Sequence, residues 1–176
     1  MDRIRVLGLG NVLMGDDAFG PTVIKVLEAR YEFGVGVTVK EIGTPGTNLV
    51  PHVSRIDALI VVDTVRAAGR PGEIRLFRGP DIMKHAPAPH LGPHDLGLTE
   101  ALFSAESSNQ APREVLLVGA IPESVESRIG LSAAIAAAVP VAVERVVAEL
   151  HRLGHRSIPR GNPGKPDLWW EQPRRA

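Results

Sequence analysis

The segment ALIVVDTV, residues 58–65, indicates the class of fold more clearly than any other part of the chain. Its first five residues are all apolar, so a strand formed here would bury both of its faces. Such a strand is typical of the centre of a parallel sheet that helices cover on both sides. The carboxylate of Asp63 follows this run, at the point where the strand ends.

Further strands and helices alternate along the chain on both sides of this segment. Strands are predicted at 3–9, 37–42, 73–78 and 114–122, and helices at 21–31, 47–55, 95–105 and 131–154. This order predicts a single α/β domain: a three-layer α/β/α sandwich around a twisted, mostly parallel five-stranded sheet.

The ends of the predicted helices and the end of the chain carry turn signals. We expect Asp95 to cap the third helix, Pro140 to kink or offset the last one, and Gly154 to end it. The domain is expected to cover residues 1–156. Residues 157–176 are rich in proline, glycine and charge, which predicts a mobile tail whose two tryptophans either dock or stay exposed.

Composition excludes several classes of function. Lysine plus arginine and aspartate plus glutamate both number 20, so the chain has no net charge to attract nucleic acid or an acidic membrane. It has no cysteine, which excludes disulfides, thiolate nucleophiles and thiolate metal sites. No secretory signal is recognisable at the start, and the apolar run 133–143 is too short to span a bilayer. We expect a soluble, cytoplasmic protein that is a monomer or a weak oligomer.

The segment GLGNVLMGDDAFG, residues 8–20, follows the first strand, where a sheet of this kind places its ligand crevice. A dinucleotide site needs a third glycine where Leu13 stands, and the two aspartates would repel a phosphate. A nucleotide-binding domain is therefore the least favoured interpretation. We expect the glycines to turn the backbone sharply off the first strand.

Carboxylates and an imidazole occur on the segments predicted to enter this crevice. One aspartate of the pair Asp16 and Asp17 suffices to cap the following helix, which leaves the other for chemistry. Asp63 ends the most apolar strand, and His94 precedes a predicted helix, whereas His90 is expected to be an ordinary loop histidine. Two carboxylates and one imidazole suit either a divalent transition metal or acid–base chemistry.

Together with GTPG, LIVVDTV, PHDLGL and VGAIPES…GLS, this opening segment resembles the hydrogenase maturation endopeptidases of nickel-iron hydrogenases, colinearly over residues 3–159. The resemblance implies an α/β domain that removes a C-terminal extension from the nickel-loaded precursor of the [NiFe]-hydrogenase large subunit. By motif, the residues that contact the metal and carry catalysis fall on Asp17, Asp63 and His94. Asp16 is then left to cap a helix or to stabilise a loop. The glycines of the opening segment are then expected to leave room at the crevice for a partner's polypeptide.

The resemblance implies that nickel comes with the substrate. Three ligands with no thiolate among them predict that the protein binds it only weakly and transiently. Either the metal or a carboxylate, as in an aspartic protease, would polarise the scissile carbonyl or activate water. Alternatively, the nickel serves only for recognition and makes cleavage conditional on metal loading. An alternative from another class is a non-catalytic nickel-binding chaperone for hydrogenase assembly that uses the same three ligands.

Two positions depart from the pattern of the family that the chain resembles. At Asp17 members carry glutamate or aspartate, and the shorter side chain is expected to shift the metal. After the second strand the usual D-G-G-T is replaced by residues 41–44, in which Ile42 stands for a glycine. This change predicts a different shape of the substrate cleft, and Glu41 retains a carboxylate there.

Overall fold

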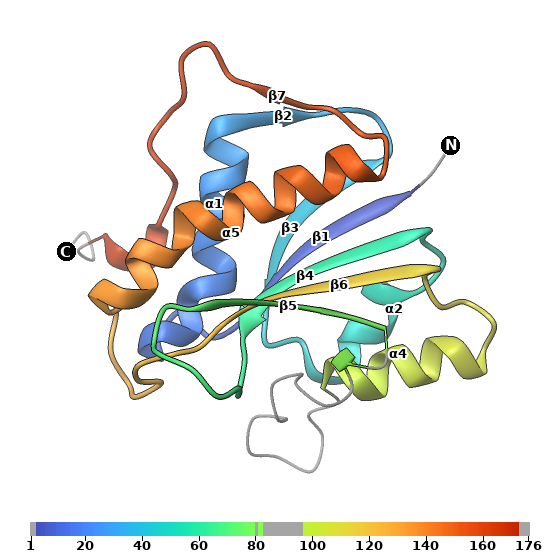
Figure 1. Ribbon diagram of the computed structural model, residues 1–176, viewed down its shortest axis with the longest axis horizontal. Coiled ribbons are helices and arrows are strands. Elements are labelled where there is room, and N and C mark those ends of the chain that lie inside the picture. Colours follow the sequence, from blue (N-terminus) through green and yellow to red (C-terminus); the bar gives the residue numbers. More distant parts are fainter. Residues whose placement is uncertain (1–2, 80, 83–96, 173–176) are drawn as a thin grey trace.

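In the computed structural model, which describes residues 3–79, 81–82 and 97–172, one central sheet carries helices on both faces (Figure 1). The elements in chain order are β1 (Ile4–Leu9), η1 (Gly15–Ala18), α1 (Phe19–Arg30), β2 (Tyr31–Phe33), β3 (Val37–Gly43), η2 (Gly46–Leu49), α2 (Val50–Val53), β4 (Ala58–Thr64), β5 (Ile74–Arg78), α4 (Leu98–Ser107), β6 (Glu114–Ala120), α5 (Ala133–Arg152), β7 (Ser157–Pro159) and η3 (Trp169–Glu171).

The sheet has the strand order β3-β1-β4-β6-β5, in which only the edge strand β5 is antiparallel to its neighbour. The predicted five-stranded, mostly parallel sheet is therefore confirmed. β4 occupies the centre, and all seven of its residues are buried, as its apolar sequence predicts. Because β1, β4 and β6 are parallel, their carboxyl ends meet at the same edge of the sheet.

The two faces of the sheet pack into two separate cores, which confirms the three layers. Ile60 and Val62 of β4 join the core under α1 and α5, whereas Leu59 and Val61 join the core under α2 and α4. Figure 1 shows these two pairs of helices on opposite sides of the sheet. Alternate side chains of one strand thus supply both cores, because successive side chains of a strand point to opposite faces.

The longest helix, α5, has defined signals at both ends. The side chain of Ser132 caps its start by accepting a hydrogen bond from the Ile135 N–H (3.3 Å). At its end Gly154 has a positive φ of 82° and His155 N donates to the Leu150 carbonyl (2.9 Å), which closes the helix as predicted. The helix runs unbroken through Pro140, which lies on its exposed side.

The helix predicted at 95–105 is α4, which begins three residues later than expected. Gly97 stands at its N-cap position and no side chain caps it there. Asp95, the predicted cap, lies outside the described residues.

The segment predicted to be a tail from residue 157 onward is joined to the body at two points. β7 pairs with β2 in an antiparallel ribbon, and the side chain of Trp170 is 4% exposed. Trp169, in contrast, is 56% exposed. Residues 157–159 and Trp170 therefore contact the rest of the chain, whereas the domain boundary at residue 156 and the mobility of the segment that follows it stay predictions. β2 and β7 escape sequence analysis because three residues are too few to show a periodic pattern.

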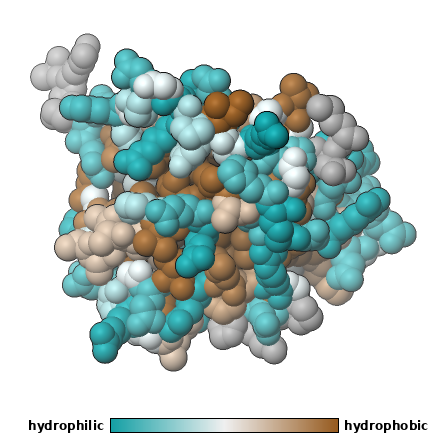
Figure 2. Space-filling model, turned by 45° about the horizontal axis from the view of Figure 1, so that its top comes forward, coloured by the Kyte–Doolittle hydropathy of each residue, from teal (hydrophilic) through white to brown (hydrophobic). Residues whose placement is uncertain are grey.

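Polar residues cover most of the face drawn in Figure 2, and apolar residues lie between them near its centre. Among the helices of the described residues, none has both the length and the hydropathy needed to cross a membrane.

Candidate active site

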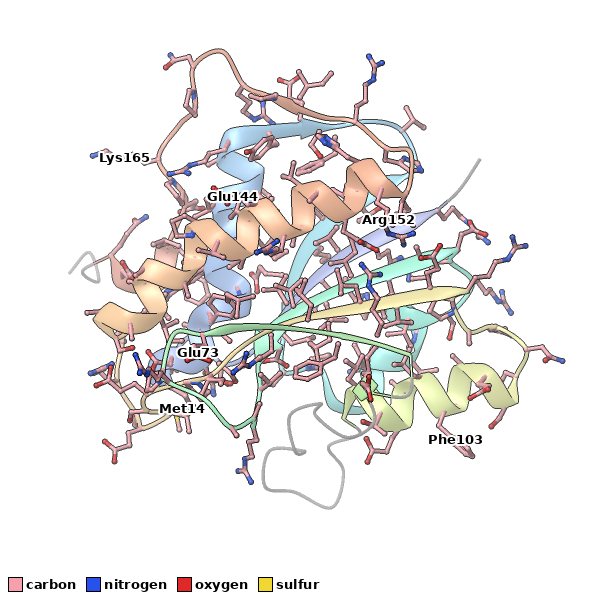
Figure 3. The ribbon with its side chains drawn as sticks, viewed as in Figure 1. Met14, Glu73, Phe103, Glu144, Arg152 and Lys165 are labelled. Atoms are coloured by element: carbon pink, nitrogen blue, oxygen red, sulfur yellow. The ribbon has the colours of Figure 1, made fainter. Side chains whose placement is uncertain are left out.

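The carboxyl ends of β1 and β4 form the edge that carries the predicted site residues. Gly8 of β1 is paired with Val62 of β4, and the next residue, Asp63, is paired with Gly119 of β6. η1 follows β1 and contacts β4. In Figure 3, Met14 at the start of η1 lies on the same side of the molecule as Glu73, which precedes β5.

Glycines bring the start of α1 into direct contact with the sheet. A Cβ on Gly20 would lie 2.2 Å from the Leu9 carbonyl oxygen and 2.4 Å from that of Val62, and one on Gly8 would lie 2.5 Å from the Gly20 carbonyl oxygen. The start of α1 therefore fills the space next to Gly8. We expected this space to admit a partner's polypeptide, and at this position that expectation is wrong. The predicted sharp turn is confirmed at Gly10, where φ is 129°.

This close packing brings Asp17 of η1 beside the end of β4. The Asp17 carboxylate accepts hydrogen bonds from Asn11 N (2.7 Å, to Oδ2) and from Thr64 Oγ1 (3.2 Å, to Oδ1). Thr64 N in turn donates to Asp63 Oδ1 (2.7 Å). Asp17 and Asp63 are 1% and 3% exposed, so two carboxylates are buried around one threonine.

The burial of two neighbouring carboxylates makes Asp63 harder to ionise. Burial raises the pKa of Asp63 well above its ordinary value, and the negative charge of Asp17 raises it further. The hydrogen bond from Thr64 N acts in the opposite direction and lowers this pKa only in part. A positive ion close to both aspartates would relieve the same repulsion, so the pair has the electrostatic character of a cation site.

Asp16 has a structural role that differs from that of its neighbour. It is fully buried, and its carboxylate accepts hydrogen bonds from the backbone N–H groups of Glu123, Ser124 and Ser132 (2.8, 3.1 and 2.7 Å) and from Ser132 Oγ (3.0 Å). Burial alone would raise the pKa of Asp16, but these hydrogen bonds outweigh it and hold the pKa below its ordinary value. The loop-stabilising role predicted for Asp16 is confirmed, and no side chain caps α1.

The sequence model of the hydrogenase maturation protease family matches residues 21–149. The chain belongs to this family. The hydrogenase 2 maturation protease of Escherichia coli K12 is 36% identical over 162 residues, which span 90% of this chain and 96% of that protein. The hydrogenase expression/formation protein HoxM of Cupriavidus necator is 34% identical over 155 residues, or 88% of this chain and 77% of that protein.

Solved structures of maturation proteases share the fold. The hydrogenase maturating endopeptidase HybD from E. coli superposes with a TM-score of 0.82 at 35% identity, covering 90% of this chain and 98% of that one. A hydrogenase 2 maturation peptidase from a Thaumarchaeota archaeon gives 0.64 at 31% identity, with 86% and 98% covered. The family is one of endopeptidases, so this protease is a hydrolase of peptide bonds and not the non-catalytic chaperone.

The described part of the protease contains two of its three predicted ligands. Asp17 and Asp63 come together as expected, whereas His94 and His90 lie outside the described residues. Within residues 3–79, 81–82 and 97–172, histidine, aspartate and glutamate side chains form no group of three or more that could hold a metal. The place of His94 beside the two aspartates therefore stays a prediction.

The departure at residues 41–44 lies at the end of β3. Glu41 pairs with Gly8 of β1, and the strand register shifts directly after this pair, where Leu9 faces Gly43. The Ile42 side chain packs against the core under α2 and α4. Ile42 therefore contributes apolar packing to the body of the protease, a role that a glycine has no side chain to fulfil.

Thr64 and Ser132 were not predicted from the sequence. Thr64 donates a hydrogen bond to Asp17 of the site, and Ser132 donates one to the structural Asp16. Thr64 directly follows Asp63 and reads as an ordinary strand residue, because threonine is common in strands. One signal was available: a hydroxyl buried at a strand end needs a hydrogen-bond partner, and the nearest predicted polar groups were the aspartates.

Proposed function

We propose that this protease removes the C-terminal extension of the nickel-loaded precursor of a [NiFe]-hydrogenase large subunit. The proposal is supported by the family and by relatives whose names specify hydrogenase maturation. The substrate is thus a folded protein with a metal site and a short peptide to be cut off. We place the reaction in the cytoplasm and expect a monomer or weak oligomer, in keeping with a chain that has no cysteine for disulfides.

We further propose that Asp17, Asp63 and His94 bind the nickel that the substrate carries. The observation that supports this role is the buried pair of carboxylates at the carboxyl edge of the sheet, where the charge of Asp17 adds to the cost of ionising the buried Asp63. Nickel between them would remove that cost, and an imidazole is a suitable third ligand. When bound there, the metal can orient the substrate and polarise its scissile carbonyl.

The chain's own groups have defined tasks in this proposal. Asp17 is presented by η1 with both oxygens hydrogen-bonded, so its orientation is set before the substrate arrives. Asp63 projects from the central strand and shares the buried site. Because cleavage would require the substrate's own metal, a precursor without nickel would lack the group that brings its peptide bond to the aspartates.

The test uses purified precursor, with and without nickel, and intact-mass spectrometry of its C-terminus. The wild-type protease is expected to shorten only the nickel-loaded precursor. The variants Asp17→Asn, Asp63→Asn and His94→Ala are expected to leave it at full length while keeping a wild-type circular-dichroism spectrum. His90→Ala and the exposed Asp167→Asn are the matched controls and should cleave normally.

Normal trimming by all three site variants would refute the assignment of the site. Trimming of nickel-free precursor at the same rate would refute the requirement for the metal. A wild-type protein that binds the precursor without shortening it would refute the proposed proteolysis.

A further inference from the structure

Thr64 is the residue that connects the two buried aspartates. Its hydroxyl donates to Asp17 Oδ1 (3.2 Å) and its backbone N–H donates to Asp63 Oδ1 (2.7 Å). Thr64 ends β4 and is itself only 5% exposed. One residue therefore gives a hydrogen bond to each of two carboxylates that come from different elements, η1 and β4.

The Thr64 hydroxyl makes a hydrogen bond to Asp17 that the backbone of β4 does not provide. The bond to Asp63 uses a main-chain N–H and would survive any side chain at position 64 except proline. The bond to Asp17 depends on the hydroxyl alone. Asn11 N, in the segment after β1, donates to the other oxygen, Oδ2, at 2.7 Å. The Thr64 hydroxyl adds a hydrogen bond from β4 to Oδ1, and the two bonds together limit rotation of the Asp17 carboxylate.

We propose that Thr64 is a positioning residue of this protease, which holds the Asp17 carboxylate at the orientation and distance from Asp63 that the substrate's metal requires. The inference rests on the proposed metal-binding function of the two aspartates. Hydrogen bonds to metal-ligating carboxylates characteristically change metal affinity or activity by about 10- to 100-fold when they are removed. Thr64 is expected to fall in this range by acting through the Asp17 carboxylate, to which its hydroxyl donates.

A purely structural role makes a different prediction. A buried hydroxyl without a partner is costly, so Thr64 would then donate to Asp17 only because that acceptor is nearest. Its removal would lower stability and leave metal binding unchanged. Thr22 provides the matched comparison, because it is 6% exposed and its hydroxyl donates to a backbone group, the Ala18 carbonyl oxygen (2.7 Å).

The experiment compares Thr64→Val, Thr64→Ser and Thr22→Val with the wild type. Valine keeps the shape of threonine without the hydroxyl, whereas serine keeps the hydroxyl. Three quantities are measured: the melting temperature, the midpoint of Ni²⁺-induced broadening of backbone amide NMR signals in the free protein, and kcat and KM for the nickel-loaded precursor. The NMR titration extends to millimolar Ni²⁺, so weak binding is measured as well.

Thr64→Val is expected to raise the Ni²⁺ midpoint and the KM by about 10- to 100-fold, with a smaller effect on kcat. Thr64→Ser should stay within about threefold of wild type, and Thr22→Val should change the melting temperature alone. The proposal is overturned if Thr64→Val binds Ni²⁺ like the wild type, or if Thr22→Val weakens binding equally.

This experiment distinguishes failure of the positioning role from failure of the proposed function. If the wild type trims the precursor and Thr64→Val trims it equally well, the positioning role is wrong and the proposed function stands. If the wild type does not trim the precursor, the proposed function is wrong, and the Ni²⁺ midpoints of the three variants alone decide the role of Thr64.

Discussion

Asp16 and Asp17 are adjacent identical residues to which the fold gives opposite surroundings. Asp16 is enclosed by hydrogen-bond donors that lower its pKa, whereas Asp17 lies beside a second carboxylate. Sequence analysis separated the two roles, because one acid suffices to stabilise a turn. It could not identify the partners, since Ser132 lies 116 residues from Asp16 and Thr64 lies 47 residues from Asp17.

Asp63→Asn is expected to raise the melting temperature of the metal-free protease at pH 7. The folded-state pKa of Asp63 lies above its unfolded value, so the folded form binds more protons between those two values. Wild-type stability therefore falls as pH rises from about 4 through the raised pKa, and the amide, which does not ionise, removes this loss.

Thermal unfolding from pH 4 to pH 8 measures the effect. The melting temperatures of the two proteins should converge at the acidic end and separate as pH rises. A variant less stable than the wild type at pH 7 would contradict the inferred repulsion between Asp63 and Asp17.

Among the elements, the contact between β1 and α1 determines where η1 lies. The sequence allowed the strand, the turn at Gly10 and the helix to be predicted, because each has a local signal. The reason for Gly20 was not predictable, since its constraint comes from the Leu9 and Val62 carbonyl oxygens of two strands. Short β2 and β7 were missed for a similar reason: their pairing is specified by a distant segment and not by their own pattern.

Gly20→Ala is expected to destabilise the protease by about 1–3 kcal/mol or more, because the new methyl group would meet backbone oxygens that cannot move independently. Gly34→Ala is the matched control, because a Cβ there meets no atom within 4 Å. Urea unfolding at neutral pH compares the two. Equal stability of both variants would show that α1 is able to move away from the sheet at little cost.

The molecule is also held together far from the site, where α5 meets the sheet. Glu149 of α5 is 5% exposed and accepts two hydrogen bonds from Arg78 of β5 (2.8 and 2.5 Å), and Arg152 joins it from the next turn at 2.8 Å. Arg152, labelled at the far end of α5 in Figure 3, also pairs with Glu114 of β6. This cluster connects the longest helix to two strands.

Glu149→Gln is expected to lower the free energy of unfolding at pH 7 by about 1–3 kcal/mol, a range reduced by the half-exposed arginines. Burial alone would raise the pKa of Glu149, but the hydrogen bonds from Arg78 and Arg152 outweigh it and lower the pKa to about 2. The stabilisation is therefore complete above about pH 5 and lost as pH falls toward 2. Urea unfolding between pH 7 and pH 3 should show the two proteins converge; a constant difference would contradict this origin.

The two tryptophans near the chain end test how firmly the last segment is attached. Trp170→Ala is expected to lower stability by about 3–5 kcal/mol, because a buried aromatic side chain is removed. Trp169→Ala, at a position 56% exposed, should change it by less than about 1 kcal/mol. Thermal melting measures both. If Trp170→Ala leaves the melting temperature unchanged, the segment is detached in solution, as the composition of residues 157–176 predicts.

The hydrogen bonds of Asp16 also constrain when the site can form during synthesis. Their donors lie 107 to 116 residues further along the chain, on the segment that leads into α5. A growing chain therefore completes its sheet strands before it can anchor the turn that presents Asp17. Because domains acquire distant contacts only after the intervening chain is made, the turn that presents Asp17 is anchored only after all strands of the five-stranded sheet have been synthesised.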